Sequence, residues 1–184
     1  PGSRPSEIAR VAPAIIEANE RLLTLTGGHA AVCVVADAIR PDMEALLEGT
    51  AIIPVAQDRL LDVLSTIDGS VACSGTITTQ LAAAGVPSVV LYRLSPITFA
   101  IAKRLMKPDH ISLVNIAAGD TLMPEFIQDD INGPEPAEAL HDMIKSDATR
   151  DRISQQLMAQ TREMRAGQGG ASDRAARAIL DLLA

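Results

Sequence analysis

Aromatic side chains are scarce in this chain of 184 residues, which has no tryptophan, one tyrosine and two phenylalanines. Proteins that bind single-stranded nucleic acid stack the bases on aromatic side chains, so this composition argues against such a platform. Positive charge is not in excess either, because the formal net charge is −7. We therefore expect no nucleic-acid partner, although a local basic site for a small anionic ligand remains compatible with this balance.

Cysteine is almost absent too, and the only two, Cys33 and Cys73, lie inside apolar runs typical of strands. We expect them to be reduced thiols in the core of a cytoplasmic protein. No apolar run approaches the roughly 18 residues that a membrane-spanning helix needs. The histidines are scattered, without the Cys/His/Asp spacing of a metal site, and no Ser-His-Asp pattern is visible. The sequence therefore predicts no metal, no cofactor and no catalytic residue within this chain.

What the chain does have is an alternation of short apolar runs and helical patterns, in a composition that is 47% hydrophobic. The expected strands are residues 30–36, 50–55, 69–74 and 86–92, and the expected helices between them are 41–49, 58–67 and 76–85. Strands joined through helices by short links predict a parallel sheet with right-handed crossovers. The predicted fold class is α/β, a Rossmann-like parallel sheet with helices on both faces.

Beyond residue 92 the pattern becomes mostly helical. We expect a helix over 95–107, a short extended piece over 110–115 and a turn of helix from Pro124. Helices are also expected over 135–146, 149–164 and 173–184, with a flexible break at 166–172. In the earlier helix 58–67, we expect the side chains of Leu60, Leu61, Val63 and Leu64 to face the core.

The strongest candidate site is the turn Ser74, Gly75 and Thr76, in "ACSGTITTQ". A strand ends at Cys73 and a helix starts at once, so free N–H groups and the positive end of the helix dipole point at the turn. Such a turn at the carboxyl end of a parallel strand is typical of a phosphate cradle, and a plain helix cap explains it equally well. Gln80, one helical turn further on, could reach a ribose; taken alone, a solvated glutamine is the simpler explanation.

A second candidate is "PGSR" at the start of the chain. Gly2 supports a tight turn, Ser3 can cap a helix, and Arg4 offers a planar guanidinium to a phosphate. A capping box with a surface arginine accounts for the same residues. Tyr92 ends a strand at the edge where ligands bind to such sheets, and capping of the core is the plainer explanation for it.

The segment 97–107 holds Phe99 together with Lys103, Arg104 and Lys107. This pattern fits a basic amphipathic helix on an anionic membrane surface, on the side of an acceptor. A core helix with a solvated basic edge fits it better, because the rest of the chain has a globular composition.

Taken in order, these motifs resemble those of one family. PGSR, SGT after a strand, a strand ending in YR, the AKR helix, "SLVNIAAG" and "PEFIQ" are together similar to the C-terminal half of lipid-A-disaccharide synthase. The resemblance covers essentially the whole chain and implies the donor-binding half of a GT-B glycosyltransferase, in which two Rossmann-like halves face each other across a cleft. It implies transfer of 2,3-diacylglucosamine from UDP-2,3-diacylglucosamine to 2,3-diacylglucosamine 1-phosphate, with inversion, release of UDP and no metal.

The resemblance also assigns roles to residues. Arg4 would contact the nucleotide or its phosphates, Ser74 to Thr76 would bind the diphosphate, and Asn115 would lie at the donor site. Gln80 stands where the family usually has a glutamate that binds the ribose, so the charge-assisted hydrogen bond of that carboxylate is lost here. The general base is expected in the N-terminal half, so this chain alone should bind nucleotide without catalysing transfer.

The same resemblance divides the chain into a UDP-binding domain, residues 1–135, and C-terminal helices, residues 136–184, that pack on it, on a neighbouring half or on another subunit. It implies as partners the N-terminal half of the same protein, a second copy in a homodimer, and the inner face of the bacterial inner membrane, met peripherally. PGSR would follow the first strand of this half, so we expect an apolar strand before Pro1.

Two alternatives remain open at this point. Another UDP-sugar enzyme of the same architecture, such as a UDP-N-acetylglucosamine 2-epimerase or the peptidoglycan glycosyltransferase, would also place a small turn under a diphosphate. A non-catalytic nucleotide-binding or oligomerisation domain would use the same fold without transferring a sugar.

Overall fold

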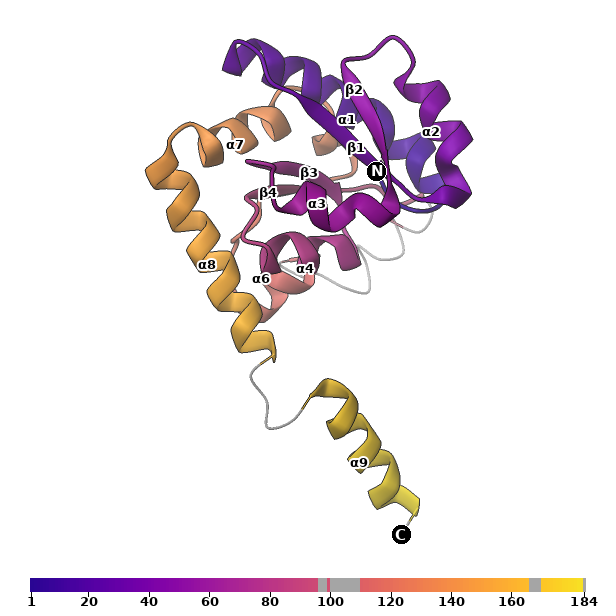
Figure 1. The fold of residues 1–184 in the computed structure, drawn as a ribbon, viewed down its shortest axis with the longest axis vertical. Helices are drawn as coiled ribbons and strands as arrows, with labels where there is room; N and C mark the ends of the chain where they lie inside the picture. The colour runs from indigo at the N-terminus through magenta and orange to yellow at the C-terminus, as the bar shows by residue number, and fades with distance from the viewer. Residues whose placement is uncertain (96–98, 100–109, 166–169, 184) are drawn as a thin grey trace.

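The computed structural model describes residues 1–95, 99, 110–165 and 170–183. Its class is α/β, as predicted, with parallel strands flanked by helices (Figure 1). The strands are β1 (Ala31–Val35), β2 (Ile52–Ala56), β3 (Ser70–Cys73), β4 (Ser88–Tyr92) and β5 (Glu125–Ile127). β-branched and other aliphatic residues make up most of the first four, which suits strands that are buried by helices.

The strands form two sheets where the sequence predicted one. β1 pairs with β2 in parallel, and β3, β4 and β5 form a second parallel sheet with β4 in the middle. Within the described residues no strand pairing joins β1 to β3. The sheet is therefore divided between β1 and β3.

The long helix α1 (Pro5–Thr26) joins the two sheets. Its Ile8 and Ala12 are buried in the cluster that includes Val35 of β1, whereas its Val11 belongs to the cluster that includes Val89 of β4. A helix buried against both sheets holds them at a fixed spacing.

The remaining helices cover the sheets and extend beyond them. They are α2 (Arg40–Leu47), α3 (Leu60–Leu64), α4 (Thr76–Ala83), α6 (Leu113–Ala118), α7 (Glu135–Ile144), α8 (Asp147–Arg165) and α9 (Ala171–Leu183), with short 3-10 helices at Asp37–Ile39, Gln57–Arg59 and Gln128–Ile131. Leu140 of α7 and Leu157 of α8 are buried in the same cluster as Val89. In Figure 1, α9 lies apart from the sheets. The division at residue 135 stays a prediction.

Two predictions of local structure were wrong. Residues 110–115 were expected to be extended, but Leu113–Ala118 is helix α6, because the side chain of Ser112 caps it by accepting from Asn115 N. A helical turn was expected from Pro124, but Glu125–Ile127 is strand β5, which pairs with β4. The predicted helix 95–107 lies outside the described residues except at Ser95 and Phe99.

The prediction for helix 58–67 was partly wrong. α3 is shorter, Leu60–Leu64, and Leu64 is buried with Leu81 of α4. The side chain of Leu61 faces solvent instead, with 77% of the residue exposed. In so short a helix only one narrow face can reach the core.

Candidate functional site

PGSR and SGT lie in the walls of one groove of about 1070 Å³. Gly2, Ser3 and Arg4 enter it from the loop before α1, and Ser74–Thr76 enter it from the end of β3. These segments are distant in the chain, PGSR directly before α1 and SGT directly after β3, and the fold brings both to the same groove. Gln80 lines the same groove from α4 and is exposed.

Hydrogen bonds to the rest of the protein hold the SGT turn on one side, and the other side of the turn is exposed to solvent. Ser74 N donates to Leu91 O at 3.1 Å, which ties the turn to β4. Thr78, which is fully buried, donates through its hydroxyl to Gly75 O at 2.7 Å. The first turn of α4 leaves N–H groups without intrahelical acceptors, and these lie beside an exposed glycine.

Gly75 has the backbone angles φ 157° and ψ −163°, a conformation that residues with a side chain rarely adopt. A Cβ built on Gly75 would meet no atom within 4 Å. The glycine is therefore required by the backbone, and the space above it is free for a ligand to approach the N–H groups.

The PGSR loop is organised by Glu7, in the first turn of α1. Ser3 N donates to Glu7 Oε2 at 3.3 Å, and Arg4 Nη1 lies 3.1 Å from Glu7 Oε1. Gly2 has φ 106°, and a Cβ there would lie only 2.7 Å from Glu7 Oε2. The prediction that Ser3 caps the helix was wrong, because the N-cap residue of α1 is Arg4 and no side chain caps the helix. The side chain of Arg4 stays 77% exposed.

Tyr92 and Asn115 are not among the residues that line this groove. Tyr92 is half-buried at the end of β4, opposite Ile127 of β5. Asn115 is fully buried: its Nδ2 donates to Met123 O at 2.7 Å and to Glu125 Oε1 at 2.9 Å, and its Oδ1 accepts from two backbone N–H groups. In this structure the Asn115 side chain holds protein groups, and its place at a donor site stays a prediction.

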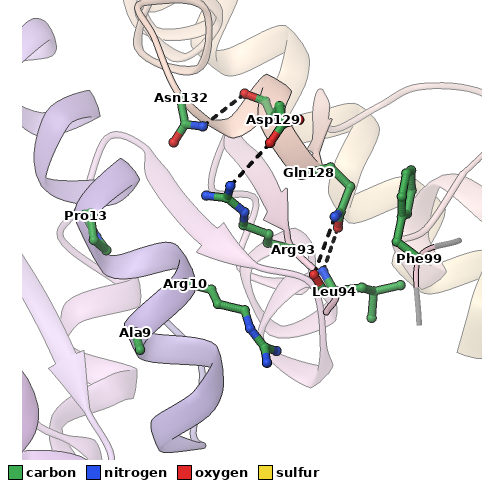
Figure 2. A pocket seen from close by; sticks show the side chains of 9 residues that line it. All are labelled: Ala9, Arg10, Pro13, Arg93, Leu94, Phe99, Gln128, Asp129 and Asn132. Carbon is green, nitrogen blue, oxygen red and sulfur yellow. Dashed lines mark hydrogen bonds and ion pairs between the residues drawn. The ribbon is translucent and has the colours of Figure 1, made fainter. Parts of the chain in front are cut away.

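A second, smaller cavity of about 520 Å³ lies between α1 and the ends of β4 and β5 (Figure 2). Its lining includes Arg10, Arg93, Phe99 and Gln128. Gln128 has φ 59°, and its side chain hydrogen-bonds the backbone of residue 94 twice, accepting at 2.7 Å and donating at 3.4 Å. Neither Arg10 nor Gln128 was predicted from the sequence as a site residue, although Gln128 ends the motif "PEFIQ".

Arg93 belongs to this second cavity and forms an ion pair with Asp129 at 3.3 Å (Figure 2). Phe99 also lies here, while Lys103, Arg104 and Lys107 lie outside the described residues. The expectation of a basic membrane-facing helix is therefore not addressed by this part of the structure.

The described part of the chain contains neither a candidate metal site nor a helix that could span a membrane. No group of three or more His, Cys, Asp or Glu side chains lies close enough to hold a metal ion among residues 1–95, 99, 110–165 and 170–183. None of the helices seen there is long and apolar enough to cross a membrane. Cys33 and Cys73 are both free and buried, and burial raises the pKa of each thiol.

Comparison with known proteins gives a consistent result. The family model described as lipid-A-disaccharide synthetase matches residues 1–180. The lipid-A-disaccharide synthase of Trichlorobacter lovleyi is 37% identical to all of this chain, and that of Geobacter sulfurreducens is 35% identical to all of it. The enzyme of the same name from Myxococcus xanthus is 34% identical, again over the whole chain. Each match covers 48% of the relative, so the chain spans about half the length of these curated proteins.

Proposed function

Since this chain belongs to the lipid-A-disaccharide synthetase family, we propose that it is the donor-binding half of a glycosyltransferase of lipid A biosynthesis. The intact protein would transfer 2,3-diacylglucosamine from its UDP derivative to 2,3-diacylglucosamine 1-phosphate and release UDP. The observation that carries the proposal is that the PGSR loop and the SGT turn line one groove.

We propose that the diphosphate of the donor binds at the SGT turn. Backbone N–H groups at the start of a helix, together with the helix dipole, favour an anion at that position. The open space above Gly75 lets phosphate oxygens come within hydrogen-bonding distance of these groups. As the bond from sugar to phosphate breaks, the leaving UDP gains negative charge, and donors already in position stabilise it without reorganising.

We propose that Arg4, which lines the same groove, supplies positive charge to the diphosphate. Its guanidinium is largely exposed and is held by a single contact with Glu7 at 3.1 Å. An exposed ion pair of this kind is worth at most about 1 kcal/mol, so a phosphate can replace it at little cost. A guanidinium binds two phosphate oxygens at once, which a lysine cannot do.

Gln80 is proposed to bind the ribose, because it faces the groove one helical turn after the SGT turn. Its amide can accept from one hydroxyl and donate to another, without the negative charge of a carboxylate. The general base, the acceptor site and the acyl-chain pockets belong in this proposal to the other half of the protein. Homodimer formation and peripheral contact with the membrane are parts of the same proposal.

The test is nucleotide titration of the intact protein, with UDP and uridine compared by calorimetry. UDP should bind more tightly than uridine, because only UDP reaches the SGT turn and Arg4. Arg4→Ala should weaken UDP binding by roughly tenfold and leave uridine binding unchanged, whereas Arg152→Ala, an exposed arginine on α8, should change neither. Equal loss for UDP and uridine, or no UDP binding at all, would overturn the proposed site.

The substrate is tested separately on the intact protein. Acylated and unacylated UDP-glucosamine should compete unequally for the enzyme, with the acylated donor favoured and the disaccharide as product. Preference for the unacylated sugar would indicate another UDP-sugar enzyme of this architecture.

A further inference from the structure

Two arginine side chains line the cavity between α1 and the ends of β4 and β5. Arg10 extends from α1, and Arg93 extends from the position directly after β4 (Figure 2). Asp129 is the one acidic residue of this lining, so the cavity holds two positive charges and one negative charge. The chain as a whole has a formal net charge of −7. The cavity is therefore a local positive site, which attracts an anion, in an acidic chain.

Both guanidinium groups are free to bind a ligand. Arg10 is exposed, and its side chain forms no ion pair or hydrogen bond with any residue that the structure describes. Arg93 pairs with Asp129 at 3.3 Å, and 91% of the aspartate side chain is exposed. An ion pair with so exposed a partner is weak, so an anion that enters the cavity can displace Asp129 from Arg93.

Gln128 fixes the backbone next to Arg93. Its side chain accepts from Leu94 N at 2.7 Å and donates to Leu94 O at 3.4 Å. Gln128 has φ 59°, and no other residue except glycine has a positive φ in the part of the chain that the structure describes. Residues in this conformation are uncommon and cluster at binding sites, because the surrounding structure must hold them there. The strand end that carries Arg93 is thus in place before a ligand arrives.

The lining also offers hydrogen-bond acceptors. Pro13 lies inside α1 and has no N–H group, so it cannot donate to Ala9 O as a residue at its position ordinarily does. Ala9 and Pro13 both line the cavity. Asn132 uses its Nδ2 to donate to Asp129 O at 3.3 Å, which leaves its Oδ1 as an acceptor. Hydroxyl groups of a ligand can donate to these oxygens, close to the two arginines.

We propose that this cavity is a second phosphate-binding site, for a dianionic phosphate that enters either free or as part of a sugar phosphate. Two guanidinium groups suit a phosphate, because each can bind two of its oxygens. The acceptors suit sugar hydroxyls, and Leu94 and Phe99 offer apolar surface to the ring. The volume of about 520 Å³ lies in the range of small-molecule sites. None of the residues that line this cavity also lines the groove of the SGT turn, so the site is independent of the proposed function.

Calorimetric titration of the intact protein with glucose 1-phosphate tests the site, with UDP in excess so that the phosphate does not compete for the SGT turn. Arg10→Gln and Arg93→Gln should each weaken the binding by roughly tenfold, because each removes charge-assisted hydrogen bonds. Binding that depends on neither arginine, or no binding at all, would overturn the proposal.

Arg40→Gln is the matched control for the two arginine variants. The side chain of Arg40 is 31% exposed, against 32% for Arg93, and it also pairs with an exposed aspartate, Asp37, at 3.5 Å. Arg40 lines neither the cavity nor the groove, so Arg40→Gln should leave the affinity for glucose 1-phosphate unchanged. An equal loss of affinity in all three variants would mean that only the net charge of the protein matters, and would overturn the proposal.

Asp129→Asn should act in the opposite direction and strengthen the binding of glucose 1-phosphate by roughly threefold. The substitution frees Arg93 from its ion pair and removes the one negative charge of the lining. Asp37→Asn makes the same change of net charge at the partner of Arg40, where the side chain is 90% exposed, and should have no effect. Gains of the same size in the two variants, or a gain in neither, would overturn the proposal.

Inorganic phosphate and glucose, titrated in the same way, identify the source of the phosphate. Tighter binding of glucose 1-phosphate than of inorganic phosphate would support a sugar phosphate as the ligand, and equal binding of the two would support free phosphate. Glucose that binds as tightly as glucose 1-phosphate would overturn the proposal, because the phosphate would then contribute nothing. Arg4→Ala should leave the affinity for glucose 1-phosphate unchanged, so failure of this site is distinct from failure of the proposed UDP site.

Discussion

Gly2 and Gly75, two of the glycines that line the groove, both have a positive φ but differ in their surroundings. At Gly2 a side chain would press against the carboxylate of Glu7, the residue that organises the PGSR loop. At Gly75 there is nothing to press against, and the requirement comes from the backbone conformation alone. A substitution at Gly75 therefore changes the surface that a ligand meets, in addition to the strain in the turn.

Gly75→Ala should weaken UDP binding by roughly tenfold or more, because its methyl group would occupy the open space above the N–H groups. The strained backbone should also lower the free energy of unfolding by about 1–3 kcal/mol. Calorimetric titration with UDP and urea denaturation measure the two effects.

Gly49→Ala is the matched control for that variant. Gly49 also has a positive φ, 78°, and no atom within 4 Å of a built Cβ, but it does not line the groove. The control should lose stability by about 1–2 kcal/mol and keep its affinity for UDP. A similar loss of UDP affinity in both variants would mean that Gly75 acts through stability only.

Gln80→Glu should strengthen UDP binding, by roughly threefold to tenfold, because a carboxylate makes stronger, charge-assisted hydrogen bonds to the ribose hydroxyls. Deoxyuridine diphosphate, which lacks one of these hydroxyls, should gain less. Gln156→Glu, the same change at an exposed position of α8, should leave both affinities unchanged. An equal effect of the two substitutions would place Gln80 away from the ribose.

At the scale of the elements, residues 110–127 form a helix and a strand that the local sequence pattern did not predict. Glu125 accepts hydrogen bonds from Ile111 N at 2.7 Å and Ser112 N at 2.8 Å, just before α6 begins. The carboxylate that fixes this helix start lies in β5, and β5 is a three-residue strand that exists only because β4 lies beside it. Both features depend on contacts distant in the sequence, so neither could be read from the residues themselves.

Asn115→Ala should lower the free energy of unfolding by about 2–4 kcal/mol, because it removes one partner from several buried hydrogen bonds at once. The groups that lose this partner include Met123 O and the backbone N–H groups of Leu122 and Met123, whereas Glu125 Oε1 keeps its hydrogen bond from Ser112 N. Asn132→Ala removes an exposed asparagine with one contact and should cost less than 1 kcal/mol. Urea denaturation measures the free energy of unfolding of both variants. Similar losses of stability in the two would contradict the assignment of Asn115 to a structural network.

The titratable side chain of His29 lies in the loop between α1 and β1. His29 Nε2 lies 2.9 Å from Asn19 Oδ1, and Nδ1 lies 3.2 Å from Thr26 Oγ1. Partial burial lowers the pKa of His29 below its usual 6.5. In the pH range just below 6.5 the unfolded chain therefore binds a proton that the folded chain does not bind.

Above pH 6.5 the titration of His29 should not reduce the free energy of unfolding. Below pH 6.5 the free energy of unfolding should fall as the pH drops towards the lowered pKa of His29 in the folded state. His29→Gln should lose less stability over that range, because it has no proton to take up. Denaturation midpoints measured between pH 7 and pH 5 test this, and parallel curves for the two proteins would remove His29 as a cause.

At the scale of the whole molecule, the sequence predicted the class and the early alternation well, because β-branched runs, capping residues and glycine stops are local signals. The residues 69–74 and 86–92, for example, contain β3 and β4. The sequence could not predict the division into two sheets, because strand pairing depends on contacts between strands that are distant in the sequence. The family resemblance implied that PGSR and SGT share one site, and both line one groove, whereas the cavity at Arg10 and Gln128 needed the positions of α1 and β5.

The packing of α1 against distant parts of the chain has a consequence for how the chain folds. α1 docks on α7, where Arg21 and Glu138 form an ion pair at 2.7 Å across 117 residues of sequence. Neighbouring units such as β3, α4 and β4 have only short loops to close, whereas this contact must wait for a very long one. We expect α1 to dock late during refolding. Until it docks, the PGSR loop has no fixed place opposite the SGT turn, so nucleotide binding should be among the last properties that the refolding chain recovers.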